Sequence, residues 1–74
     1  MTRLPRNVSG RECVRALERA GYKVRRQTGS HIILTREEPP TLLTVPDHRN
    51  IKPGTLRSII RQAELTVEEF VDLL

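Results

Sequence analysis

The stretch HIILTREEPPTLLTV, residues 31–45, decides the fold, because it reads as two short strands joined by a tight reversal. Branched side chains dominate residues 31–35 and 41–45, as is typical of strands. Between them, residues 37–40 read Glu-Glu-Pro-Pro, a run that breaks the chain and reverses its direction. The stretch therefore predicts an antiparallel strand pair.

A third strand-like segment precedes this pair. In residues 22–25, Tyr22 and Val24 alternate with basic residues, which predicts a half-buried strand. Residues 27–30 predict a polar turn around Gly29. Together the three segments are expected to form a three-stranded antiparallel meander.

Strand alternation assigns the side chains of the central stretch to two faces of the sheet. One set should meet the helices and build the core: Ile32, Leu34, Leu43 and Val45. The other set should lie on the uncovered face: His31, Ile33, Thr35, Leu42 and Thr44. Ile33 and Leu42 would then be partly exposed apolar neighbours, which indicates a surface for a protein partner.

The first helix is expected directly after Ser9. Ser9 and Glu12 have the spacing of a capping box, and Gly21 suits the end of the helix because it can take a positive φ. The apolar positions of this helix include Cys13, whose single thiol has no partner for an internal disulfide. A stripe of arginines should lie opposite its apolar face: Arg11, Arg15 and Arg19.

Two further helices are expected after the strands. Pro53 suits the first turn of one, and apolar residues at helical spacing run from there to Ala63. Thr66 and Glu69 form a second capping box, which starts a short last helix. Its packing residues should be Val67, Phe70, Val71 and Leu74. The order predicts an α+β fold, α-β-β-β-α-α, with a three-stranded antiparallel sheet covered by helices on one face.

Size and charge limit the classes of function. At 74 residues, the chain reads as one domain over residues 1–74 with a thin core. All 13 basic residues lie within residues 1–61 against five acidic ones, a net +8, whereas residues 62–74 carry a net −4. Eleven of the 13 are arginines, which grip phosphates with paired donors, so a nucleic-acid partner is favoured.

Other classes of function find little support. The two aromatic residues, Tyr22 and Phe70, are too few for a base-stacking platform. No apolar run is long enough to span a membrane, and residues 1–5 do not resemble a signal peptide, so we expect a cytoplasmic protein with no membrane partner. The two histidines, His31 and His48, lack the companions of a zinc site, so neither a metal nor another cofactor is expected.

The triplet Gly29-Ser30-His31 carries the candidate chemistry. Its imidazole can move protons near neutral pH in a strongly cationic setting, although a histidine at a strand end is commonly a solvated side chain with no catalytic role. Ser30 could contact substrate or cap the turn, and Gly29 should permit an unusual backbone angle and close approach of a ligand. His48 could be a second acid–base group, but a structural role is favoured because no local residue orients it.

Taken in order, several motifs resemble the HicA mRNA interferase family of bacterial toxins, also known as YcfA-like proteins. They extend over roughly residues 4–74 and include Leu17–Tyr22 (LERAGY), Arg26–His31 (RQTGSH), Lys52–Ile59 (KPGTLRSI) and Arg61–Thr66 (RQAELT). The resemblance implies a fold like the double-stranded RNA-binding domain. It also implies a type II toxin that cleaves mRNA without a metal and is neutralised by a HicB-like antitoxin. The toxin alone is expected to be monomeric. With the antitoxin it is expected to form a hetero-oligomer.

The family's catalytic histidine falls on His31, with Gly29 and Ser30 also matching. We interpret His31 as the general base that takes the proton of the ribose 2′-hydroxyl, or as the acid on the leaving group. Candidate RNA-binding residues around it are Arg25, Arg26, Ser30, Gly29 and Arg36, with Arg15 and Arg19 on the first helix. The alternative functions are a non-catalytic RNA-binding module of the same fold and a pure interaction protein.

Overall fold

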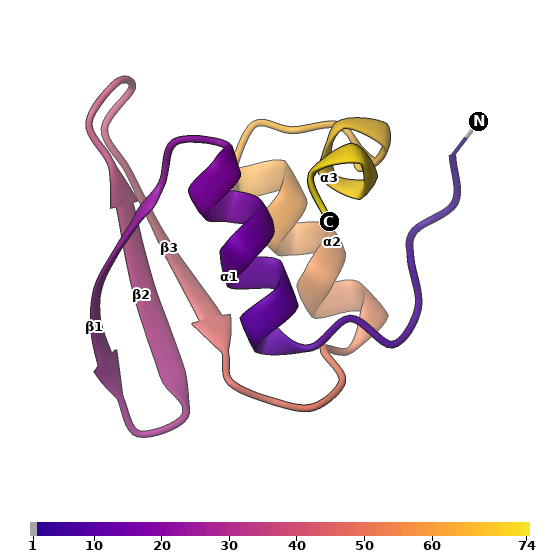
Figure 1. Ribbon diagram of the computed structural model, residues 1–74, viewed down its shortest axis with the longest axis horizontal. Helices are drawn as coiled ribbons and strands as arrows, with labels where there is room; N and C mark the ends of the chain where they lie inside the picture. The colour runs from indigo at the N-terminus through magenta and orange to yellow at the C-terminus, as the bar shows by residue number, and fades with distance from the viewer. Residues whose placement is uncertain (1) are drawn as a thin grey trace.

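The computed structural model describes residues 2–74, which form an α+β fold of three helices and three strands. The order is α-β-β-β-α-α, as the sequence predicted: α1 Gly10–Arg19, β1 Lys23–Thr28, β2 His31–Arg36, β3 Thr41–Pro46, α2 Pro53–Gln62 and α3 Val67–Leu73. The sheet has the strand order β1-β2-β3, and both pairs are antiparallel. In Figure 1, α1 and α2 lie against one face of the sheet, and α3 packs on these helices away from it.

Both predicted capping boxes are confirmed, and they explain where two of the helices begin. The Ser9 hydroxyl accepts from the Glu12 N–H at 3.1 Å, and the Glu12 carboxylate accepts from the Ser9 N–H at 2.9 Å. Thr66 and Glu69 make the same two contacts at 3.0 and 2.8 Å. These bonds satisfy backbone donors that have no partner inside a helix.

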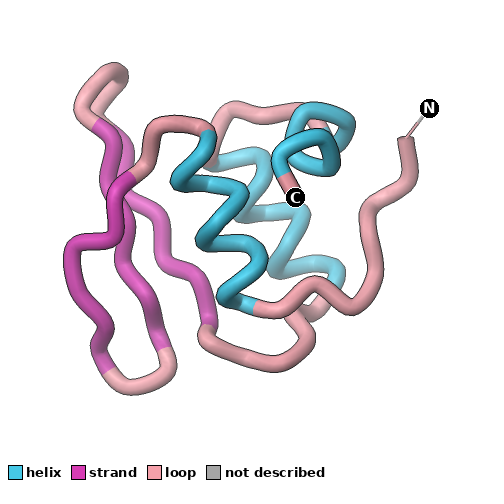
Figure 2. Tube along the Cα trace, in the orientation of Figure 1, coloured by secondary structure: helices cyan, strands magenta, loops and turns pink. Residues whose placement is uncertain are grey.

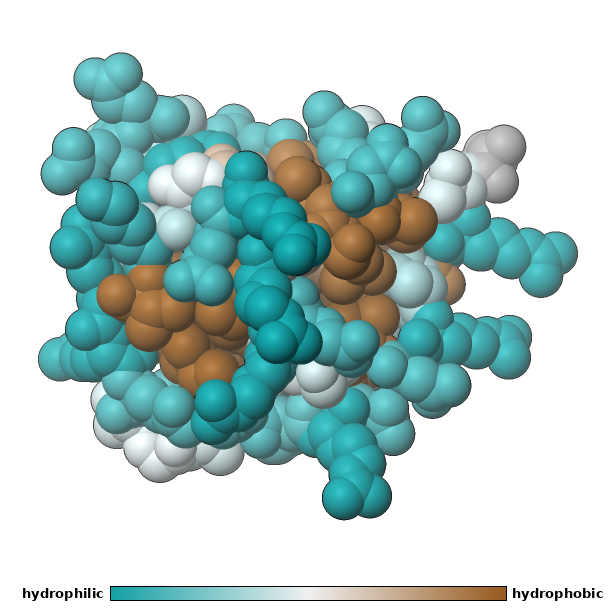
Figure 3. Space-filling view, in the orientation of Figure 1, coloured by the Kyte–Doolittle hydropathy of each residue, from teal (hydrophilic) through white to brown (hydrophobic). Residues whose placement is uncertain are grey.

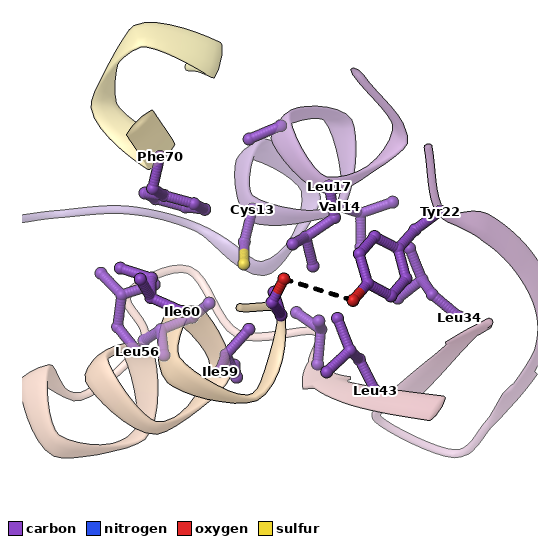
Figure 4. Close-up of a cluster of buried hydrophobic side chains, with 14 of the residues drawn as sticks. Cys13, Val14, Leu17, Tyr22, Leu34, Leu43, Leu56, Ile59, Ile60 and Phe70 are labelled. Carbon is purple, nitrogen blue, oxygen red and sulfur yellow. Dashed lines mark hydrogen bonds between the residues drawn. The ribbon is translucent and has the colours of Figure 1, made fainter. Parts of the chain in front are cut away.

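The core lies between the sheet and the helices, on the face that strand alternation predicted. Ile32 pairs with Val45 and Leu34 with Leu43, and all four side chains are buried. Figure 4 shows side chains of α1, α2, β2, β3 and α3 converging there. The hydroxyl of Tyr22 points to the end of α2, where it donates to the Ala63 carbonyl at 3.5 Å.

Three local expectations were wrong. Residues 27 and 28 belong to β1, because Gln27 pairs with Ile32 and Thr28 with His31, so the turn is reduced to Gly29-Ser30 (Figure 2). At the C-terminus, Leu73 packs against the core, whereas Leu74 is 43% exposed. Val24, expected to be half-buried, is also 43% exposed, beside a groove between α1 and β1.

Candidate functional site

The uncovered face of the sheet carries the candidate catalytic residue. His31 is the first residue of β2, its side chain is exposed, and it pairs with Thr28 on one side and Pro46 on the other. Within residues 2–74, the imidazole has no hydrogen-bond partner. Both of its nitrogens are therefore accessible to a substrate approaching from solvent.

The turn before His31 is open to a ligand but tied to the body of the protein. Gly29 has φ +58°, and a Cβ built there would meet no atom within 4 Å. The carbonyl of Ser30 accepts a 2.6 Å hydrogen bond from the N–H of Asp47, at the start of the β3–α2 loop. Ser30 therefore has a backbone role in holding the turn, and its exposed side chain remains available to a substrate.

A β-bulge brings two arginines to the face that carries His31. The pairing of β1 with β2 shifts between Val24 and Arg26, so that Arg25 is an extra residue. The Arg25 Nε donates to Thr35 Oγ1 at 2.7 Å, which places Arg25 on the uncovered face, and Arg26 pairs with the outward Ile33. Bulges re-aim side chains in this way. Since all of β1 is exposed, its Lys23, Arg25 and Arg26 form a basic row along the edge of the sheet, and Arg26, which is paired with Ile33, is the member nearest to His31.

Arg36 lies elsewhere. Its guanidinium stacks 4.6 Å from the centroid of the Tyr22 ring and its Nη2 lies 3.2 Å from Glu64 Oε1. Only 18% of its side chain is exposed, and it stands at the opposite end of β2 from His31, about 16 Å away at the rise of an extended strand. The structure therefore does not bring Arg36 together with His31.

The arginine stripe of α1 does not share a face with His31; its Arg11 and Arg15 border the edge strand β1, whereas Arg19 lies against the C-terminal residues. Arg11 and Arg15 line the groove between α1 and β1, and Figure 3 shows apolar surface between the sheet and these hydrophilic side chains. Arg19 donates to the Leu73 carbonyl at 2.6 Å, so part of its hydrogen-bonding capacity is used within the chain. An RNA strand that touched both His31 and Arg15 would have to cross β1.

The two predicted partner residues lie on the uncovered face. Leu42 is 61% exposed, the largest exposure among the large apolar side chains of residues 2–74. Ile33 is half-buried on the neighbouring strand, where Thr44 is its cross-strand partner. Leu42 pairs with Thr35, so Leu42 and Ile33 are diagonal neighbours on adjacent strands and form a small apolar surface, of which Ile33 is the nearer to His31.

Sequence reasoning did not find Gln27 and Asp47 as neighbours of the turn. Gln27 Nε2 donates to Asp47 Oδ2 at 3.1 Å and to the Gly29 carbonyl at 3.2 Å, and Arg11 Nη2 lies 3.4 Å from the same carboxylate oxygen. Gln27 and Asp47 are 20 positions apart, and no local spacing signals such a pair. A pairing of β1 with β2 that allowed for the bulge would have placed Gln27 on the same face of the sheet as Asp47.

The other candidate groups have structural surroundings. His48 is exposed, and its carbonyl accepts from the Gly10 N–H at 2.8 Å, which ties the loop to the start of α1. Cys13 is fully buried, and burial raises the pKa of its thiol to about 12, so it is protonated at neutral pH. Residues 2–74 contain no cluster of three or more side chains with metal-ligand chemistry, and no helix among them is long and apolar enough to cross a membrane.

Comparison with known proteins gives one finding. The family model described as HicA toxin of bacterial toxin-antitoxin matches residues 10–65, which include α1, the whole sheet and α2. None of the curated proteins matches the chain.

Proposed function

The chain belongs to the HicA toxin family of bacterial toxin–antitoxin systems, and from that premise we propose that it is an endoribonuclease that cleaves mRNA and so inhibits translation. The observation that carries the proposal is the position of His31. Its exposed imidazole stands at the end of a strand, beside an open glycine turn and a row of basic side chains. A strand of RNA can reach this imidazole from solvent.

The chemistry needs little from the protein, because RNA carries its own nucleophile. His31 takes the proton of the ribose 2′-hydroxyl, and the 2′-oxygen attacks the adjacent phosphorus. The bond from phosphorus to the 5′-oxygen breaks, which leaves a 2′,3′-cyclic phosphate and a 5′-hydroxyl that takes up a proton. General acid–base catalysis of this kind contributes about 10²–10⁴-fold to a rate. The reaction as proposed uses no metal.

Arg26 is the proposed phosphate ligand nearest to His31, and Arg25, which bonds to Thr35 four residues further along β2, would hold a more distant phosphate. Both lie on the face of the sheet that carries the imidazole, and guanidinium groups stabilise the negative charge that develops on a pentacoordinate phosphorus. Gly29 and Ser30 offer an open turn next to the scissile phosphate. Arg15 and Arg19 would contact more distant phosphates, and Arg36 is left out of the proposed set because it is stacked on Tyr22.

We further propose that the antitoxin is a HicB-like protein that covers the uncovered face of the sheet. Leu42 and Ile33 supply apolar contact there, and an acidic partner segment would match the basic row of β1. Such a complex would be a hetero-oligomer that blocks His31, whereas the free toxin is a monomer. The free toxin and the complex would both be located in the cytoplasm, where mRNA is translated.

The test is His31→Ala with His48→Ala as its matched control. We expect His31→Ala to slow cleavage of a long single-stranded RNA by about 10²–10⁴-fold, with unchanged thermal unfolding and RNA affinity. His48→Ala should cleave at the wild-type rate, and chelation of divalent cations should not change either result. If wild-type protein bound RNA without cleaving it, the chain would be an RNA-binding module; if His31→Ala cleaved normally, the catalytic assignment would be wrong.

A further inference from the structure

We propose that Asp47 is a positioning residue for His31, acting through the Gly29-Ser30 turn and not on the substrate. The proposal rests on the proposed function, since it concerns the same imidazole. It assigns a role to a loop residue 16 positions away in the chain from the histidine it positions.

The contacts of Asp47 converge on the turn. Its N–H donates to the Ser30 carbonyl at 2.6 Å, and its Oδ2 accepts from Gln27 Nε2 at 3.1 Å. The same Gln27 amide nitrogen donates to the Gly29 carbonyl at 3.2 Å. The Ser30 carbonyl is therefore held by the backbone of Asp47, which side-chain substitutions keep, and the Gly29 carbonyl by Gln27, which the Asp47 carboxylate holds in place.

The carboxylate acts mainly as a hydrogen-bond acceptor for Gln27. Its other contact, Arg11 Nη2 at 3.4 Å, comes from a side chain that is 73% exposed, whereas the Asp47 side chain is only 22% exposed. Ion pairs with an exposed partner contribute little to stability. We infer that the acceptor oxygen matters more than the negative charge, which an asparagine at the same position can test.

Asp47 is itself fixed to the start of α1. The Gly10 N–H donates to the His48 carbonyl at 2.8 Å, and a Cβ at Gly10 would collide with the carbonyl oxygen of Pro46. The loop at residues 46–48 thus lies directly on the helix terminus. Since helices are rigid on the scale of a turn, Asp47 connects the position of His31 to the body of the protein.

At the opposite end of β2, Arg36 ties the strand itself to Tyr22 and Glu64, but no hydrogen bond among residues 2–74 holds the carbonyls of the turn to a distant side chain. In the turn at residues 37–40, the side-chain hydrogen bond is local, from Thr41 Oγ1 to the Pro39 carbonyl at 2.9 Å. Figure 1 shows both hairpin turns extending past the ends of the helices, so the two turns differ in their hydrogen bonds and not in their position. The connection through Asp47 is therefore specific to the end of the strand that carries the imidazole.

Loss of the connection should affect the chemical step more than binding. A displacement of about 1 Å of a catalytic group can slow a reaction by as much as 10²-fold. We expect Asp47→Ala and Gln27→Ala each to lower kcat by about 10-fold with little change in KM. The double variant should be no slower than either single variant, because the two side chains form one connection. Asp47→Asn keeps an acceptor oxygen and should retain most of the wild-type kcat.

The experiment measures RNA cleavage and the amide hydrogen exchange of residues 29–31 on the full chain. Thr41→Ala is the matched control, because it removes a single hydrogen bond at the other turn; it should leave kcat and the exchange at residues 29–31 unchanged. Faster exchange with a lower kcat in Asp47→Ala and Gln27→Ala supports the proposal. Asp47→Asn and Gln27→Ala carry the test if Asp47→Ala does not fold.

Three kinetic results would overturn the proposal. One is a wild-type kcat in both Asp47→Ala and Gln27→Ala. Another is a loss of kcat in Asp47→Asn as large as in Asp47→Ala, because it would show that the negative charge and not the acceptor oxygen is responsible. The third is a higher KM at constant kcat, which would make Asp47 a substrate contact. If the wild type cleaved no RNA, the proposed function would fail by itself, whereas unchanged exchange at residues 29–31 would overturn only the role of Asp47.

Discussion

The two faces of the sheet are built by alternate residues of the same strands and have opposite properties. On the face toward the helices, Ile32, Leu34, Leu43 and Val45 are at most 5% exposed. On the other face, Leu42 is 61% exposed, and the imidazole of His31 has no hydrogen-bond partner among the described residues. Stability therefore depends on one face and the candidate chemistry on the other. A substitution in a strand should affect either stability or RNA cleavage, depending on which face its side chain lies on.

The sharpest test of this division is a pair of adjacent leucines in β3. Leu43→Ala should lower the free energy of unfolding by about 2–5 kcal/mol, because its fully buried side chain would leave a cavity. The same change at Leu42 should alter it by less than about 0.5 kcal/mol, because that side chain faces solvent. Urea unfolding followed by circular dichroism measures both.

A domain of 74 residues has a total stability of only about 4–11 kcal/mol, so Leu43→Ala could unfold the protein. Leu43→Val, which removes one methylene, would then keep the comparison measurable, with an expected loss of about 1 kcal/mol. Equal losses at positions 42 and 43 would show that both faces are covered in solution.

Two arginines extend the comparison to charged residues. Arg36→Ala should destabilise the fold by about 1–3 kcal/mol, because the side chain is packed on Tyr22 and mostly buried. Arg26→Ala should leave stability unchanged and weaken RNA binding, with the slope of log K against log salt reduced by about 0.7 for a single strand. Binding is measured in the His31→Ala background, so that the RNA stays intact.

The outcome also decides which arginines belong to the RNA surface. If Arg36→Ala reduced the salt slope as much as Arg26→Ala, Arg36 would have to leave Tyr22 and reach a phosphate. If Arg26→Ala changed stability and not binding, the basic row of β1 would be an ordinary solvated edge.

Local signals in the sequence predicted most of the fold. Capping boxes at Ser9 and Thr66 involve residues three positions apart, and both are confirmed. Alternation in residues 31–45 placed both faces correctly, because β2 and β3 pair without interruption. The prediction for β1 was wrong at its end, because it placed residues 27 and 28 in the turn and did not include the bulge at Arg25. A bulge depends on the pairing of two strands, so one strand's sequence does not reveal it.

The candidate site was predictable in part, for the same reason. The exposure of His31 follows from alternation and is confirmed. If the alternation of residues 31–35 is continued by one residue, Arg36 falls on the face of the sheet that carries the core residues and not on the face of His31. By contrast, the Gln27–Asp47 contact joins two segments that only the folded chain brings together.

The smallest expected effect concerns Glu12, which starts the helix that covers the inner face. Hydrogen bonds from the Ser9 backbone and side chain, and the nearby charge of Arg15, hold the pKa of this carboxyl below its ordinary value of 4.5. A group with a lowered folded pKa stabilises the protein above its unfolded pKa, and that contribution is lost as the pH falls through the folded value.

Glu12→Gln still fits a capping box but does not titrate. The stability difference between wild type and Glu12→Gln, measured by urea unfolding, should therefore be constant above about pH 6 and change between about pH 5 and 3 in favour of the variant. Glu18→Gln, on the same helix but outside the capping box, reports the dependence due to the chain's other carboxyl groups. If the Glu12→Gln difference stayed flat over this range, the pKa of Glu12 would be the same in the folded and unfolded chain, and the charge of Glu12 in the capping box would not stabilise the start of α1.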